Sequence, residues 1–76
     1  MNASYSDTGI IVRVVDSGEA DKFISVISEN HGLSIFLARG VRRPTSKKSS
    51  HLDLFNLIKF SVGRGDSPRF LHQVES

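Results

Sequence analysis

The chain has 76 residues and a mass of 8.4 kDa, enough for one small domain. Hydrophobic residues make up 38% and charged residues 24% of the sequence, so the chain can bury a core, and these values exclude wholesale disorder. No uncharged apolar stretch approaches the roughly 20 residues of a membrane span, and the lack of cysteine excludes disulfides and a Cys-based zinc site. We therefore expect residues 1–76 to form a single domain. A domain this small, with no disulfide and no evident metal site, has marginal stability by itself. We therefore also expect it to be a piece of a longer protein.

Basic residues are concentrated in one segment. Residues Arg39–Lys48 hold five of the ten lysines and arginines and no acid, whereas the other 66 residues hold five bases and eight acids. A positive segment on a slightly acidic body is typical of a polyanion-binding surface, although a solvated loop has the same composition. The first residues, MNASYSD, lack the basic and apolar regions of a secretory signal, so a cytoplasmic location is expected.

The first apolar run is Gly9–Val15, which is rich in β-branched residues and is predicted to be a strand. Alternation places Ile10, Val12 and Val14 on one face and Arg13 on the other. The polar residues that follow, 16–19, are typical of a turn.

The next segment, Ala20–Asn30, is ambiguous. Its apolar residues fit helical spacing, Asp16 and Glu19 can form a capping box, and Gly32 can end a helix. A strand is the alternative, with Ile24 and Val26 on one face. Periodicity alone favours the helix.

Three further runs follow. Leu33–Ala38 has a strict period of two, with Leu33, Ile35 and Leu37 on one face and Ser34, Phe36 and Ala38 on the other. Leu52–Val62 also alternates, Gly63–Pro68 is a turn-forming loop, and Arg69–Val74 is the last run. All three runs are predicted to be strands.

Four strands and one contested segment in so short a chain predict a small all-β barrel. If the contested segment is a strand, there are five. The basic segment falls between the third and fourth strands, where a barrel of the OB type has a helix or long loop. We predict an all-β, five-stranded OB-fold Greek-key barrel, with a basic loop or short helix between strands 3 and 4.

Five short motifs then carry a resemblance to a known family. They are Asp16–Lys22 (DSGEADK), Glu29–Gly32 (ENHG), Ala38–Pro44 (ARGVRRP), Leu52–Ile58 (LDLFNLI) and Gly63–Gly65 (GRG). In this order and spacing, from about residue 6 to residue 75, they resemble the N-terminal domain of the RecO family of bacterial recombination mediators. Ser17 and Leu54 stand where that family often has an aromatic residue and a proline.

The resemblance implies an OB-fold and therefore changes the expectation for Ala20–Asn30 from a helix to the second strand. It also implies that the protein binds single-stranded and double-stranded DNA and anneals complementary strands. With RecR, such proteins load RecA onto DNA coated by single-stranded DNA-binding protein. Members of the family continue into a helical domain that often holds a zinc site. By this resemblance the chain is expected to be a first domain, in a nucleoid-associated protein.

An OB barrel binds single strands with a basic groove and flat side chains, usually on strands 2 and 3 and the loops beside them. Arginine suits the groove because its planar group pairs with phosphate and stacks on bases. Phe36 is the expected stacking residue, because most other phenylalanines are in core register; the alternative is that it packs under the loop after strand 3. The expected DNA-binding residues are Arg13, Lys22, Phe36, Arg39, Arg42, Arg43, Lys47, Lys48, Arg64 and Arg69.

No motif predicts catalysis, since the sequence has no P-loop and no nucleophile elbow, and its serines have no histidine partner nearby. His31, His51 and His72 are too widely spaced to predict a metal site, and no cofactor is expected. Two alternatives to DNA binding stay open. One is an RNA-binding OB domain, and the other is a protein-interaction module that docks a partner such as RecR through the basic segment.

Overall fold

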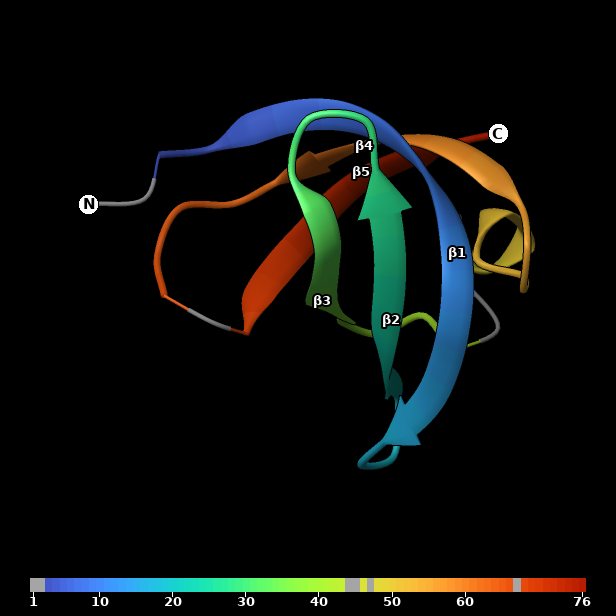
Figure 1. Cartoon of the computed structure of the whole chain (residues 1–76). Helices are drawn as coiled ribbons and strands as arrows, with labels where there is room; N and C mark the ends of the chain where they lie inside the picture. Colours follow the sequence, from blue (N-terminus) through green and yellow to red (C-terminus); the bar gives the residue numbers. More distant parts are fainter. Residues whose placement is uncertain (1–2, 44–45, 47, 67) are drawn as a thin grey trace.

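The computed structural model describes residues 3–43, 46, 48–66 and 68–76. Five strands form a closed barrel in the order β1-β2-β3-β5-β4, as the OB-fold prediction requires (Figure 1). The elements are β1 (Tyr5–Ser17), β2 (Asp21–Ser28), β3 (Gly32–Ala38), the 3₁₀ helix η1 (Ser49–His51), β4 (Leu57–Val62) and β5 (Arg69–Glu75). Within these described residues, no helix is long and apolar enough to cross a membrane.

The long first strand, β1, pairs with both β4 and β2. Its first half lies antiparallel to β4, from Tyr5 opposite Val62 onward, and its second half lies antiparallel to β2. Gly9 belongs to both ladders, and a Cβ at this position would lie 2.6 Å from the carbonyl oxygen of Ile27. A side chain is therefore excluded where the strand crosses from one partner to the other.

A β-bulge in β1 reverses its inward face. The register between β1 and β2 shifts between Ile11 and Arg13, so one extra residue is inserted into β1. Before the bulge, Ile11 is fully buried and Ile10 is 43% exposed; after it, Val14 packs on the core. The expectation that Ile10 and Val14 share one face is wrong, because simple alternation takes no account of the bulge.

The contested segment is a strand. Residues Asp21–Ser28 form β2 and pair along β3 as a hairpin, so the helix favoured by periodicity is wrong and the OB-fold expectation is confirmed. Ile24 and Val26 are fully buried, whereas Ile27 is exposed. The hairpin partners decide the conformation here, overriding the local spacing.

The inward face of β3 is the reverse of the expected one. Phe36 is 3% exposed and lies opposite the buried Ile24, with its ring 5.5 Å from that of Phe60. Leu33 and Ile35 point outward instead and are exposed. Phe36 is therefore a core residue, and its ring cannot offer a face to a base.

The connection from β3 to β4 packs two apolar side chains, Val41 and Leu52, into the core around η1. β4 begins at Leu57, later than the expected strand, because the chain before it turns at Phe55 with φ 67°. Hydrogen bonds from Phe55 N to Ile11 O and from Ile11 N to Asn56 O fasten this turn to β1.

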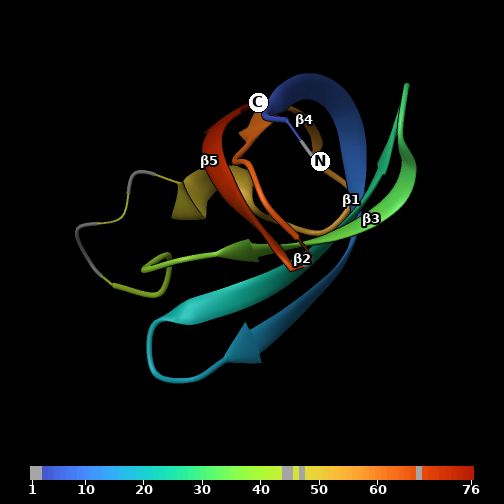
Figure 2. The ribbon, with the colours of Figure 1, turned by 90° about the vertical axis from the view of Figure 1, so that its left-hand side faces the viewer.

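The barrel closes where β5 meets β3. The two strands are parallel, with Phe36 opposite Arg69 and Leu37 opposite Phe70, and β5 also pairs antiparallel with β4 (Figure 2). The core inside the ring of strands contains Ile11, Ile24, Val26, Phe36, Ala38, Val41, Leu52, Ile58, Phe60, Val62 and Leu71.

Candidate nucleic-acid interface

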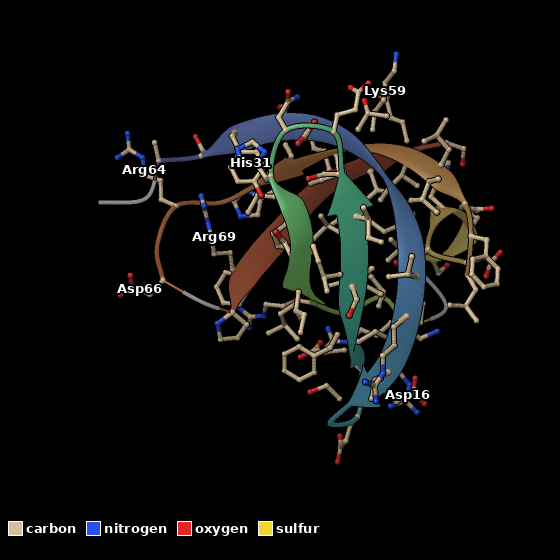
Figure 3. All side chains as sticks on the ribbon, in the orientation of Figure 1. Asp16, His31, Lys59, Arg64, Asp66 and Arg69 are labelled. Atoms are coloured by element: carbon tan, nitrogen blue, oxygen red, sulfur yellow. The ribbon has the colours of Figure 1, made fainter. Side chains whose placement is uncertain are left out.

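Five of the ten expected binding residues lie near one or the other end of β3: Arg39, Arg42, Arg43, Arg64 and Arg69. This strand runs from the β2–β3 hairpin, beside His31, to its end at Ala38 next to Arg39. Seven residues at about 3.3 Å each make it about 23 Å long. Arg64 and Arg69 lie on the same side as His31, whereas Asp16 marks the opposite end of the barrel (Figure 3).

At the far end, the β3–β4 connection and the β1–β2 turn are held together by Arg42. Its Nη1 donates to Gly18 O at 2.8 Å, and its Nη2 lies 3.6 Å from the Asp16 carboxylate. Its backbone N–H also donates to Ala20 O at 2.9 Å. The ion pair is exposed and contributes little, so the positioning comes mainly from these hydrogen bonds.

Two neighbouring arginines at this end are open to a ligand. Arg43 is exposed, and its side chain has no hydrogen bond or ion pair with the described residues. Arg39 lies with its guanidinium carbon 5.3 Å from the centre of the Phe70 ring, which leaves its charge at the surface. Acidic residues lie close by, since Asp21 Oδ1 accepts from Gly40 N at 2.7 Å. A groove of about 510 Å³ is lined by Glu19, Ala20, Asp21, Arg39, Gly40 and Arg43.

Several predicted residues lie apart from this group. Lys48 donates from Nζ to Leu71 O at 2.9 Å, and burial lowers its pKa. It therefore anchors the connection to β5 and is poorly placed for a phosphate. Arg13 is exposed on β1, and Lys22 is half-buried at the start of β2. Lys47 lies outside the described residues.

At the hairpin end, Arg69 is held by backbone carbonyls. Its Nε and Nη2 donate to Gly63 O at 2.9 and 2.8 Å, and Nη2 also donates to Ala3 O. Its guanidinium carbon lies 5.0 Å from the centre of the Tyr5 ring. The same ring stacks on His31, with centroids 3.8 Å apart and an interplanar angle of 20°. Arg64, in the loop before β5, is exposed.

A buried carboxylate holds His31. The Asp7 side chain is 1% exposed; Oδ2 accepts from His31 Nδ1 at 2.7 Å and from Asn30 N at 3.1 Å. Oδ1 accepts from Thr8 N at 2.8 Å and from Asn30 Nδ2 at 2.9 Å. Burial acts to raise the pKa of Asp7, but these hydrogen bonds outweigh it and hold the pKa well below its usual range. The carboxylate stays ionised and fastens the hairpin to β1.

Sequence reasoning missed this stack of Arg69, Tyr5 and His31. In the sequence, His31 stands out only as part of the ENHG motif and as one of three widely spaced histidines, and its partner Asp7 is 24 residues away in the chain. A groove of about 800 Å³ lies next to the stack. Residues from β3, the N-terminal part of β1 and the loop before β5 line it, among them Tyr5, His31, Leu33, Ile35, Pro68 and Arg69.

A row of exposed aliphatic side chains crosses the outer surface of four strands. Ile10 lies opposite both Leu57 and Ile27, and Ile27 lies opposite Leu33. These four side chains are 43–65% exposed. Contiguous exposed apolar surface of this kind is typical of a site that binds another molecule.

Comparison with known proteins gives these features a family context. Residues 1–76 match the family described as "Recombination protein O N terminal". The DNA repair protein RecO of Cutibacterium acnes is 38% identical over 72 residues, which are 95% of this chain and 29% of that protein. Those of Bifidobacterium adolescentis and Rubrobacter xylanophilus are each 32% identical, over 95% and 97% of this chain and 29% and 30% of their own lengths. The chain thus spans about three tenths of the length of these relatives.

Proposed function

The chain belongs to the RecO family, in the part described as N-terminal, and from that premise we propose that it is a non-catalytic module that binds DNA without sequence specificity. The names of its relatives support a role in DNA repair. The observation that carries the proposal is the exposure of Arg39 and Arg43 at one end of β3 and of Arg64 on the side of its other end (Figure 3). Arginine pairs with phosphate regardless of the base attached.

The arrangement suits a DNA backbone that runs along β3. The strand's length of about 23 Å matches a short single-stranded site of a few nucleotides, at the lower end of the range for OB domains. A duplex presents the same phosphates, so double-stranded DNA is a ligand as well. If Arg39, Arg43 and Arg64 each contact one phosphate, log affinity for a single strand falls with log salt at a slope of about −2.

The test is fluorescence anisotropy of a labelled single-stranded oligonucleotide with three charge-reversal variants of this chain, across a salt series. Arg43→Glu and Arg64→Glu change the two proposed phosphate sites. Lys59→Glu is the matched control, because Lys59 is exposed on β4, away from both sites (Figure 3). We expect each arginine variant to weaken binding and lower the slope by about one contact, and the control to keep both.

Three outcomes would contradict this proposal. Equal losses in all three variants would mean that net charge, and not these positions, attracts the DNA. An absence of binding by the folded chain at low salt would reject the DNA module. A higher affinity for single-stranded RNA than for single-stranded DNA of the same length would favour the RNA-binding alternative.

Protein docking is the second candidate function, favoured by the row of Leu57, Ile10, Ile27 and Leu33. We propose RecR as the partner, and we propose that annealing, contact with single-stranded DNA-binding protein and RecA loading belong to the full-length protein. Ile27→Asp should abolish RecR binding and leave DNA affinity unchanged. A variant that retains RecR binding would remove this row from the interface.

A further inference from the structure

The stack at the hairpin end has one open face. The Tyr5 ring is already in contact with both the Arg69 guanidinium and the His31 imidazole. The His31 side chain is 40% exposed, although one face of its ring rests on Tyr5. We propose that His31 is a seat for one nucleobase of a DNA single strand, which stacks on the imidazole and extends the stack by one ring.

The imidazole is fixed before any ligand arrives. Asp7 holds its Nδ1, and the backbone N–H of His31 donates to Ser28 Oγ at 3.2 Å. Arg69 fixes the other end through its bonds to Gly63 O and to Ala3 O. A base that stacks here therefore meets a ring that loses little freedom on binding. Arg69 and Asp7 are positioning residues for this seat.

The surroundings fit a base attached to a phosphate. The groove of about 800 Å³ beside the stack has apolar walls from Leu33, Ile35 and Pro68. Arg64 is exposed in the loop before β5, on the same side of the molecule as His31 (Figure 3). A flat apolar ligand with an anionic substituent satisfies both features. Every base has a face that can stack, so this seat is expected to tolerate any sequence.

This inference rests on the proposed DNA binding, and the test separates the two. Binding of this chain is compared between an oligothymidylate and an abasic deoxyribose-phosphate strand of the same length and charge. We expect the oligothymidylate to bind about tenfold tighter, as one stacked base provides. Equal affinity for both strands would leave phosphate binding intact and overturn the seat. Binding of neither would overturn both proposals.

Two variants place the effect at this ring. His31→Ala should abolish the preference for thymidylate over the abasic strand and leave the salt slope unchanged, because no phosphate contact is lost. His31→Phe keeps a flat ring and should retain most of the preference. A folded His31→Ala variant that keeps the full preference would overturn the proposal.

The unaltered chain provides a readout that needs no variant. The ring protons of His31 should shift upfield in NMR spectra when oligothymidylate is added and not when the abasic strand is added. The other two histidines, His51 and His72, serve as internal controls. Equal shifts of all three rings, or none at His31, would refute a base stacked on His31.

Discussion

Replacing Asp7 by asparagine is expected to destabilise the barrel strongly. Each carboxylate oxygen accepts two hydrogen bonds: Oδ1 from Thr8 N and Asn30 Nδ2, and Oδ2 from Asn30 N and His31 Nδ1. An asparagine amide has a donor in place of one oxygen. In either orientation of the amide, its NH₂ group faces a backbone N–H, that of Thr8 or that of Asn30, so one hydrogen bond is lost and two buried donors oppose one another. The Asn30 side-chain amide can turn, and the His31 ring can change tautomer, to accept from the new NH₂ group.

The magnitude follows from the one lost hydrogen bond and from the weakening of the others once their acceptor is no longer charged. A hydrogen bond to a charged group contributes about 1.5–3 kcal/mol, and relief of the burial of a charge offsets part of the loss. We expect the free energy of unfolding to fall by about 3 kcal/mol. A domain of 76 residues has roughly 4–11 kcal/mol in total, so this is a large fraction. With a urea dependence of about 1–1.5 kcal/mol per molar, the midpoint falls by about 2–3 M.

Urea denaturation followed by circular dichroism measures this shift. Asp53→Asn is the matched control, since it makes the same charge change at an exposed carboxylate that forms no hydrogen bond with the described residues. Its midpoint should stay within a few tenths of a molar of the parent. The reasoning is refuted if both variants unfold at the same urea concentration as the parent.

Three further results are expected from the same structure. Because the folded pKa of Asp7 lies below its unfolded value, its contribution to stability is present above about pH 4 and is lost as the pH falls below that, so acid should lower the urea midpoint of the parent more than that of Asp7→Asn. Gly9→Ala should cost about 2–3 kcal/mol in urea denaturation, because the new methyl group meets the Ile27 carbonyl oxygen at 2.6 Å; a cost below 0.5 kcal/mol would contradict the close approach. Phe55→Gly should raise the melting temperature by a few degrees, since φ 67° favours glycine and the Phe55 side chain is 74% exposed, whereas Leu54→Gly should not.

The sequence predicts the number and order of the strands better than it predicts their faces. In β3, both faces carry apolar side chains, so alternation indicates a strand without saying which face is buried. Phe36 is inside because it lies opposite the buried Ile24 across the hairpin, and Ala38 shares its face, which is a property of the pairing and not of β3 alone. In β1, the bulge beyond Ile11 changes the face within one strand.

For the candidate site, too, the sequence predicts some features and only the folded structure reveals the others. A charge count finds the basic segment, and Arg39 and Arg43 are exposed as expected. The charge count does not reveal that the Lys48 ammonium donates a hydrogen bond to the Leu71 carbonyl, because these two residues are 23 positions apart in the chain. The Tyr5–His31 stack needs the hairpin to fold back on the start of β1, so only the assembled barrel brings it together.

The short pairing between β3 and β5 determines where the barrel opens locally. Among the described residues, two residue pairs join these strands, whereas β1 and β2 are paired along eight positions. Separating β3 from β5 therefore breaks fewer strand pairings than separating any other two neighbouring strands of the barrel. The residues paired between β3 and β5, such as Phe36 and Arg69, are 33 positions apart in the chain. Amide hydrogens of Arg69 and Phe70 should exchange with solvent earlier than those in the middle of β2. The barrel is thus a curled sheet with one lightly fastened edge, expected to close last during folding.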